Sequence, residues 1–483
     1  MKISLQHTRG DIRHAIVLAP SSFTFEMTLP GLDEPLRKAL QAYIERENWE
    51  WKADKTAVVS FADSADTIIL AGLGKTDRIT PSGLRKSAAV AIRKACQLKA
   101  GRAALWLATL PKLDNVAGIV AETALLADYT FDTYLTKKSK NRLDELVLVG
   151  DADKAALEEA QLTATATMLA RDLVNEPANT LLPEELASRA QQAGARFGFE
   201  VEVFDEKAIR DEFKMEAFWS VAQGSDNPPR FIVMRWKGAP SGDITALVGK
   251  GLTYDSGGYA MKPPVGMVKM KCDMGGSAAV IGAMCAIAGA KLKANVTAVV
   301  AACENMVSGH AFRNGDIIGS MAGKTIEVVN TDAEGRLTLI DAITYVLNYE
   351  KASRVIDIAT LTGAVVSALD GVRLGVVSND DELCAQLETA SEASDERIWR
   401  LPHDKEYLEL IKSKIADLRN SGKGGAGTIT AGLFIREFVQ DKPWLHLDIA
   451  GTAFADKPGA YWPEGATGSG VRLLYHLIKQ RQS

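Results

Sequence analysis

The stretch TIEVVNTDAEGRLTLIDAITYVL, residues 325–347, places two acids and a base between two regular patterns. Residues 325–329 have the β-branched composition of a strand, and residues 337–347 carry apolar side chains at helical spacing. Asp332, Glu334 and the neighbouring arginine therefore fall between a strand and a helix. Loops at the carboxyl ends of strands are where open α/β sheets bind ligands. The stretch predicts an α/β fold with a charged site at one edge of a sheet.

The rest of the chain repeats this alternation of strand and helix. Short β-rich runs and amphipathic helical segments before residue 150 predict a first α/β domain. An alanine-rich helical segment, residues 151–173, carries the predicted domain junction. Apolar β runs follow at residues 244–248, 296–302, 354–359 and 444–449. Helical segments separate these runs, which is typical of a mostly parallel central sheet flanked by helices. We expect a smaller N-terminal α/β domain, residues 1–160, and a larger C-terminal α/β domain, residues 161–483.

Composition limits the classes of function. The chain has 483 residues, 47% hydrophobic and 24% charged, which describes a globular protein of two domains. Its net charge of -5 gives no electrostatic case for a general nucleic-acid binder, although a local basic patch stays open. Five scattered cysteines without a CxxC pair indicate neither a disulfide framework nor a thiolate zinc site. Without an apolar signal-peptide core or a run that looks long enough to span a bilayer, we expect a cytoplasmic protein with no membrane association.

Further acids occur near a glycine-rich segment, GKGLTYDSGG at residues 249–258. We expect Asp255, Asp273, Asp332 and Glu334 on loops after strands, where four carboxylates would repel one another unless cations neutralised them. Oxygen ligands without cysteine or nearby histidine suit Mg²⁺, Mn²⁺ or Zn²⁺, and four carboxylates are enough to bridge two ions. The alternative is that these acids only cap turns and helix ends.

These segments resemble the motifs of the leucyl aminopeptidase (cytosol aminopeptidase) family. The resemblance rests on GKGLTYDSGG, on MKCDMGG at residues 270–276 and on the uncommon octamer NTDAEGRL at residues 330–337. It extends from about Arg171 to the carboxyl terminus and implies that the C-terminal domain is catalytic. Residues 259–264 depart from the commonest family wording and are similar to the bacterial peptidase B branch, which leaves the substrate preference open.

The resemblance implies a site for two divalent ions. Asp255 and Glu334 would bridge both ions, Asp332 would bind the more exchangeable one, and Lys250 and Asp273 would bind the tighter one. A lysine can be a ligand only as a neutral amine, a form that adjacent positive charge favours. An anion-binding or solvated lysine is the alternative at this position. Mn²⁺ or Zn²⁺ are the implied ions, with Mg²⁺ as another candidate at the exchangeable site.

Two cationic side chains have implied catalytic roles. A lysine like Lys262 polarises the scissile carbonyl, and an arginine like Arg336 holds a bicarbonate that acts as general base. The alternative for Arg336 is an ion pair with Asp341 or Glu334. We expect a structural role for His446, which alternates with leucines in a predicted strand.

The resemblance also implies the reaction and its substrate. The substrate-binding positions it matches are Met270, Asn330, Thr360, Leu361, Gly363 and Ala450. Their small or apolar character suits an uncharged side chain such as leucine, although such residues are also ordinary core. The implied activity is hydrolysis of the N-terminal peptide bond of peptides by a water or hydroxide that bridges two metal ions. The glycine-rich segment at residues 421–432 is expected to form a wall of the site.

Assembly and regulation are implied less directly. Family members form homohexamers, and the usual two-domain plan implies a macro-like first domain with an assembly or regulatory role. An additional DNA-binding or regulatory role, as in some bacterial relatives, is the alternative function.

Overall fold

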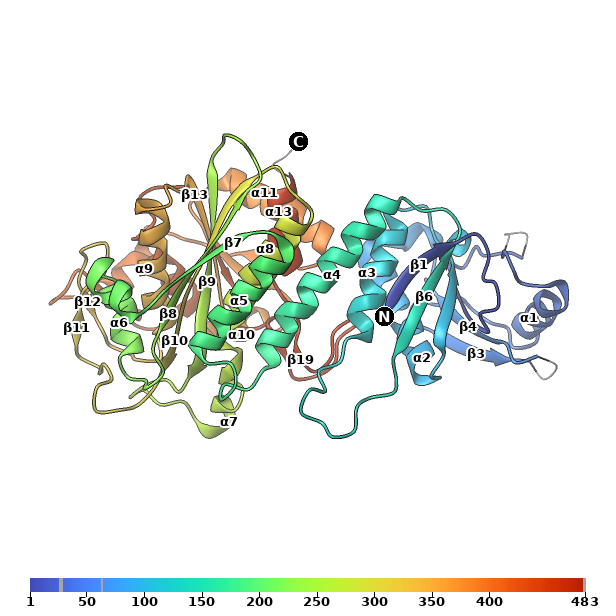
Figure 1. Cartoon of the computed structure of the whole chain (residues 1–483), viewed down its shortest axis with the longest axis horizontal. Coiled ribbons are helices and arrows are strands. Elements are labelled where there is room, and N and C mark those ends of the chain that lie inside the picture. Colours follow the sequence, from blue (N-terminus) through green and yellow to red (C-terminus); the bar gives the residue numbers. More distant parts are fainter. Residues whose placement is uncertain (26–28, 62–63, 481–483) are drawn as a thin grey trace. The chain divides into compact units, whose positions relative to one another are not determined.

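The computed structural model describes residues 1–25, 29–61 and 64–480 and divides the chain into two compact units (Figure 1). The first unit comprises Met1–Thr165 and Lys457–Pro463, and the second comprises the remainder. The division falls within α4 (Lys154–Asn175), the helix in which the sequence places the domain junction. The short return of residues 457–463 to the first unit was not predicted. Arg93 holds it there, because its guanidinium donates to the carbonyls of Gly459 (2.7 Å) and Trp462 (3.1 Å).

The first unit is built on a six-stranded sheet. Its strands lie in the order β1 (Lys2–Gln6), β6 (Leu143–Val149), β5 (Gly101–Trp106), β2 (His14–Ala19), β4 (Thr67–Gly72) and β3 (Thr56–Ser60). Among the described strands of this sheet, β3 alone runs antiparallel to its neighbour. The helices are α1 (Glu34–Arg46), α2 (Pro81–Gln97) and α3 (Val116–Asp128). Helix α3 is not predicted from the sequence, because it is apolar and buried on almost every side and so lacks an amphipathic pattern.

The second unit is built on an eight-stranded sheet. Its strands lie in the order β15 (Ile398–Arg400), β14 (Leu374–Ser378), β17 (Trp444–Asp448), β13 (Arg354–Ala359), β9 (Ile244–Asp255), β10 (Asn295–Asn305), β8 (Arg230–Lys237) and β7 (Glu200–Phe204). The four central strands, β17, β13, β9 and β10, are mutually parallel, and antiparallel neighbours flank them on both sides. The carboxyl ends of the central strands therefore meet at one edge. The predicted fold class, two α/β domains with a mostly parallel central sheet, is confirmed.

Helices cover both faces of this sheet (Figure 1). One face packs against α5 (Pro183–Phe197), α8 (Gly275–Gly289), α11 (Asp381–Ser394) and α13 (Val471–Lys479). The other face packs against α6 (Glu216–Ala222), α9 (Gly335–Asn348) and α12 (Gly427–Arg436). Successive residues of β9 alternate between the two cores, with Leu247 in the first and Ala246 and Val248 in the second.

Two segments differ from their predicted form. The glycine-rich segment after Val248 is not a loop, because β9 continues through it to Asp255. Gly249 in this segment allows α8 to pack closely against the strand: a Cβ atom on Gly249 would lie 2.7 Å from the carbonyl oxygen of Gly276, at the start of α8, and 2.8 Å from Ser277 Cα. The strand predicted at 325–329 shrinks to β12 (Ile326–Glu327), which pairs with β11 (Ile317–Ile318) and β16 (Leu418–Arg419) in a separate small sheet.

The helical stretch Met270–Gly289 differs from the expectation that no run of the chain is long and apolar enough to span a bilayer. It is long and apolar enough to cross a membrane by length and composition. In the structure, 89% of its apolar window is buried in the second unit. Core helices of globular domains pass the same test, so the stretch is weak support for a membrane span.

Candidate metal centre

The site lies where the parallel strands of the second unit end. Asp255 is the last residue of β9 and is paired with Asn305, the last residue of β10. On the other side, Ala359 at the end of β13 is paired with Asp448 at the end of β17. Residues that directly follow these strands, such as Thr360, therefore reach the same edge. Ligand sites of open α/β sheets occur at this edge.

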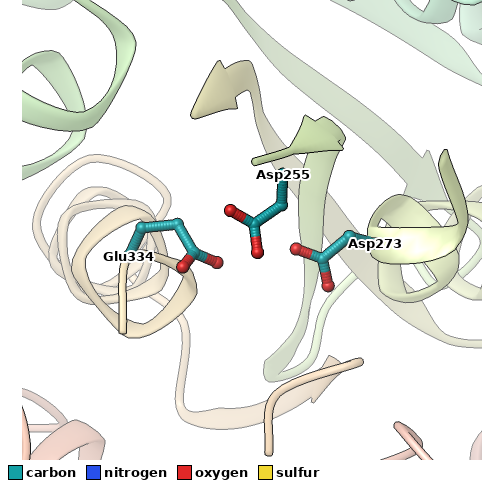
Figure 2. Close-up of side chains that lie close together, drawn as sticks. All are labelled: Asp255, Asp273 and Glu334. Carbon is teal, nitrogen blue, oxygen red and sulfur yellow. The ribbon is translucent and has the colours of Figure 1, made fainter. Parts of the chain in front are cut away.

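Three buried carboxylates converge there (Figure 2). One oxygen from each of Asp255, Asp273 and Glu334 lies within 4.8 Å of the others, and the residues are only 1%, 4% and 1% exposed. Asp273 is part of a short 3₁₀ turn, Met270–Met274, and Glu334 directly precedes α9. The expectation that all the acids lie on loops after strands is thus wrong for Asp255, which ends a strand, and for Asp273, which lies in a helical turn. Glu334 lies in the loop between β12 and α9, as expected.

Lys250 projects from β9 into the same cluster. Its Nζ atom lies 2.7 Å from Asp273 Oδ2 and 2.9 Å from Glu334 Oε1, and it donates to the carbonyl of Thr360 at 3.1 Å. Burial acts to lower the pKa of Lys250, but the surrounding carboxylates, Asp273 foremost, raise it overall. Among the acids alone Lys250 is an ammonium, and a ligand role requires the positive charge of bound cations to favour the neutral amine.

Lys262 and Asp332 occupy the more open side of the cluster. The Lys262 Nζ atom lies 2.7 Å from Asp255 Oδ2 and 2.5 Å from Asp332 Oδ1. The Asp332 side chain is 33% exposed, against 2% for Asp255, so it is the carboxylate most accessible to solvent. Burial raises the pKa of Asp255 to about 6, with the neighbouring Glu334 carboxylate as the next cause. Four carboxylates thus face two ammonium groups, and the excess negative charge favours binding of cations.

A buried acceptor without a partner supports the same conclusion. Glu334 Oε2 is fully buried and accepts no hydrogen bond from any residue in the described part of the chain. Leaving such an oxygen unpaired is costly unless a cation satisfies it. Asp255, Asp273 and Glu334 therefore fit a divalent ion, and Asp332 extends the oxygen donors toward the open side, as a second ion requires.

Arg336 lies deeper, in the first turn of α9. The residue is 6% exposed, and its Nη1 atom donates to the carbonyl of Asn420 at 2.7 Å. Over residues 1–25, 29–61 and 64–480, its Nε atom has no hydrogen-bond partner and no carboxylate forms an ion pair with it. Asp341, considered from the sequence as a partner, instead accepts from the amides of Phe218 and Met321, both at 2.9 Å. Burial lowers the pKa of Arg336 to about 10, which leaves a cation suited to an exogenous anion.

A cavity of about 520 Å³ joins these groups to the proposed substrate positions. Every candidate site residue lines it: Lys250, Asp255, Lys262, Met270, Asp273, Asn330, Asp332, Glu334, Arg336, Thr360, Leu361, Gly363 and Ala450. The glycine-rich segment forms another wall through Ser421, Gly422, Gly424, Gly425 and Gly427, as expected. The structure thus brings the whole set together. Their specific roles stay predictions.

Asn305 is not predicted from the sequence as a site residue, although it orients Asp255 in the cluster of acids. The residue is fully buried, and its Nδ2 atom donates to Asp255 Oδ1 (2.8 Å) and to the carbonyl of Thr331 (3.0 Å). The Thr331 hydroxyl in turn donates to the carbonyl of Gly257 and accepts from the amide of Ala260, both at 2.8 Å. Its position in the sequence could have indicated this role, because Asn305 is a polar residue at the end of an apolar strand. That strand lies beside the strand that ends in Asp255.

His446 and Cys272 belong to residue types that often act in catalysis, but their surroundings indicate structural roles. His446 is fully buried, with Nδ1 2.5 Å from Asp357 Oδ1, and does not line the cavity. Cys272 lines the cavity, but burial raises its pKa to about 12, which keeps the thiol protonated and poorly nucleophilic.

Comparison with known proteins agrees with this geometry. Residues 168–475 match the catalytic domain of the cytosol aminopeptidase family, and residues 23–138 match the N-terminal domain of that family. The chain belongs to the cytosol aminopeptidase family. The resemblance seen in the sequence is therefore confirmed, and membership identifies this family member as a metal-dependent aminopeptidase, which is a hydrolase.

Individual relatives extend over nearly the whole chain. A probable cytosol aminopeptidase of Clostridium perfringens is 52% identical over 432 residues, 87% of each chain. A probable cytosol aminopeptidase of Alkaliphilus oremlandii is 44% identical and covers 94% of this chain and 93% of its own. Among solved structures, the bottromycin maturation enzyme BotP in complex with Mn has a TM-score of 0.89, 31% identity and coverage of 98% and 100%. A tomato leucine aminopeptidase mutant has a TM-score of 0.87, 32% identity and coverage of 99% and 96%.

Proposed function

We propose that this family member removes the N-terminal residue of peptides, with a preference for leucine and other uncharged side chains, at a centre of two divalent ions. The observation that carries the proposal is the convergence of Asp255, Asp273 and Glu334 in a cavity that is also lined by Met270, Leu361, Gly363 and Ala450. Mn²⁺ or Zn²⁺ fits these donors, and Mg²⁺ fits the more open position beside Asp332. When bound, the two ions would supply an activated bridging water or hydroxide.

The side chains of the protein have complementary roles in this proposal. Asp255 and Glu334 would hold both ions, Asp332 the exchangeable one, and Asp273 with Lys250 the tighter one. Lys262, at the open side of the cluster, would direct its ammonium toward the scissile carbonyl and stabilise negative charge that develops on its oxygen. Arg336, buried without a carboxylate partner in the described chain, would hold a bicarbonate that takes up the proton.

The cavity walls support the proposed substrate preference. Met270, Leu361 and Ala450 offer apolar surface to a first side chain, and Gly363 leaves room for it. None of these four residues carries a charge that would recognise an acidic or basic side chain. Asn330 adds an amide at the wall that could bind the peptide backbone.

Metal removal tests the proposal. Protein dialysed against a chelator is expected to lose hydrolysis of leucine amide and to recover it on addition of Mn²⁺ or Zn²⁺, because the acids alone offer no nucleophile. Glu334→Gln should prevent recovery and lower the bound metal measured by elemental analysis. Glu327→Gln, on a glutamate outside the cavity lining, is the matched control and should recover fully. Undiminished turnover by metal-free protein would contradict the proposal.

Location and assembly are part of the same proposal. We expect a cytoplasmic enzyme of peptide catabolism that acts as a homohexamer. The first unit, which the family resemblance implies to be macro-like, would contribute to assembly or regulation.

A further inference from the structure

Asp448 is a fully buried carboxylate at the end of β17 that the proposed chemistry does not use. Its Oδ1 atom accepts from the amides of Leu361 (3.1 Å), Thr362 (3.4 Å) and Ala450 (3.2 Å). Its Oδ2 atom accepts from the Thr362 hydroxyl at 2.6 Å. These donors come from the segments that follow β13 and β17, so one carboxylate holds the ends of two neighbouring strands.

The Thr362 hydroxyl extends this network to α12. A hydroxyl has one proton and two acceptor lone pairs. The proton of Thr362 is committed to Asp448, and one lone pair accepts from the Val365 amide at 3.1 Å as the N-cap of α10 (Gly363–Leu369). The Thr428 hydroxyl, 2.9 Å away, must therefore be the donor to the remaining lone pair. Every hydrogen-bonding position of Thr362 is then filled, and the direction of each bond follows from the acceptor-only character of Asp448.

The groups bound to this network form three walls of the cavity. Leu361 and Thr362 line one side, and Ala450 lines the next. Thr428 fixes the start of α12 between Gly427 and Thr430, which line the third. The first wall is also connected to the metal centre, through the residue that directly precedes Leu361.

That connection runs through Thr360. Its hydroxyl donates to Asp273 Oδ1 at 2.8 Å, and its carbonyl accepts from Lys250 at 3.1 Å. The segment 360–362 therefore connects the acids at one end with Asp448 at the other.

We propose that Asp448 is a positioning residue that sets the size and shape of the pocket for the first side chain of the substrate, through Thr362 and Thr428. The inference rests on the proposed aminopeptidase function and adds the residue that determines its specificity. Asp448 itself does not line the cavity, so it would act through the residues that it binds. It fixes three walls whose relative placement decides which side chain fills the pocket, and a difference of one methylene in such a pocket changes kcat/KM by about 10- to 200-fold.

The test compares kcat/KM for the p-nitroanilides of leucine, methionine and alanine, using the full chain loaded with Mn²⁺. In Asp448→Asn, an amide donor replaces one acceptor, so Thr362 must give up one of its three bonds. Thr362→Val and Thr428→Val remove the hydroxyls while they keep the side-chain shape. We expect each variant to lower the leucine-to-alanine ratio of kcat/KM by about tenfold, mainly through a higher KM for leucine. If Asp448→Asn fails to fold, the two valine variants carry the test.

Asp341→Asn is the matched control for burial, since Asp341 is also a fully buried carboxylate that accepts backbone amides but does not line the cavity. It should leave the substrate ratio unchanged even if it lowers the melting temperature. An equal fall of kcat for all substrates with unaltered KM in the three test variants would mean loss of active protein only, and it overturns the inference, as does an unchanged ratio. A parent chain that cleaves none of the substrates overturns the proposed function as well.

Discussion

At the scale of single residues, the centre depends on neutral groups that orient its acids. Asp255 has two oxygens to offer, and one is engaged by the amide of Gly257 (2.9 Å) and the side chain of Asn305 (2.8 Å). These two donors fix the carboxylate plane before any cation binds. Groups that orient ligands in this way commonly change metal affinity about 10- to 100-fold when they are removed.

Asn305→Ala tests this positioning. We expect about tenfold weaker Mn²⁺ binding by calorimetry, because Asp255 loses a donor that orients it. Thermal unfolding should show a loss of about 1–3 kcal/mol, since the Thr331 carbonyl is left unpaired in the interior. Asn295→Ala, at the other end of the same strand, is the control and should keep the parent affinity. Equal affinities in both variants would show that the Asn305 contact has no role in metal binding.

At the scale of elements, close approach of backbone around Lys250 shapes the site. The start of α8 packs against β9 and β13 through Gly276, and the start of α9 packs against the Lys250 side chain through Gly335. A Cβ atom on Gly335 would lie 2.3 Å from Lys250 Cε and 2.7 Å from Nζ. The Lys250 amine cannot easily move aside, because Asp273, Glu334 and the Thr360 carbonyl hold it.

Gly335→Ala should therefore displace either the lysine or the first turn of α9. We expect the free energy of unfolding to fall by about 1–3 kcal/mol, as overpacked cores do, and Mn²⁺ binding to weaken with it. Chemical denaturation and calorimetry measure the two effects. Gly309→Ala, where an added Cβ meets nothing within 4 Å, should show neither. Parent-like metal binding in Gly335→Ala would mean that the tight contact with Lys250 is not required.

At the scale of the whole molecule, exposed apolar side chains suggest surfaces that an assembly would cover. Val265 is 85% exposed, Val268 79% and Ile415 64%. A preference for burying such groups is the ordinary driving force of stable association.

The proposed hexamer has a measurable mass. Light scattering on the purified chain should give about 312 kDa, six times the 52.0 kDa of one chain, and the value should hold on dilution if apolar contacts stabilise the assembly. Addition of Mn²⁺ should leave this mass unchanged, because the cluster of acids lies within one chain. A mass of one chain at all concentrations would rule the hexamer out.

The sequence by itself determined the class of fold and the chemical types at the site. Continuous apolar β runs separated by helical segments indicated a mostly parallel sheet with two covered faces, because both patterns are local properties of the chain. The motifs around Asp255, Asp273 and Glu334 identified the acids, because their residue types and spacing are visible without coordinates. The same local reading was wrong where packing overrode it, as in the continuation of β9 through its glycines to Asp255.

Only the tertiary structure decided which groups meet. Asn305 contacts Asp255 from 50 residues away, and Asp448 binds Leu361 across 87 residues. No periodicity links such pairs. They meet because parallel strands bring their carboxyl ends to one edge, and the order of strands in the sheet, which local sequence does not encode, sets which ends are neighbours. The convergence of three acids within 4.8 Å and the lack of an ion pair between Arg336 and any carboxylate in the described chain are likewise consequences of packing.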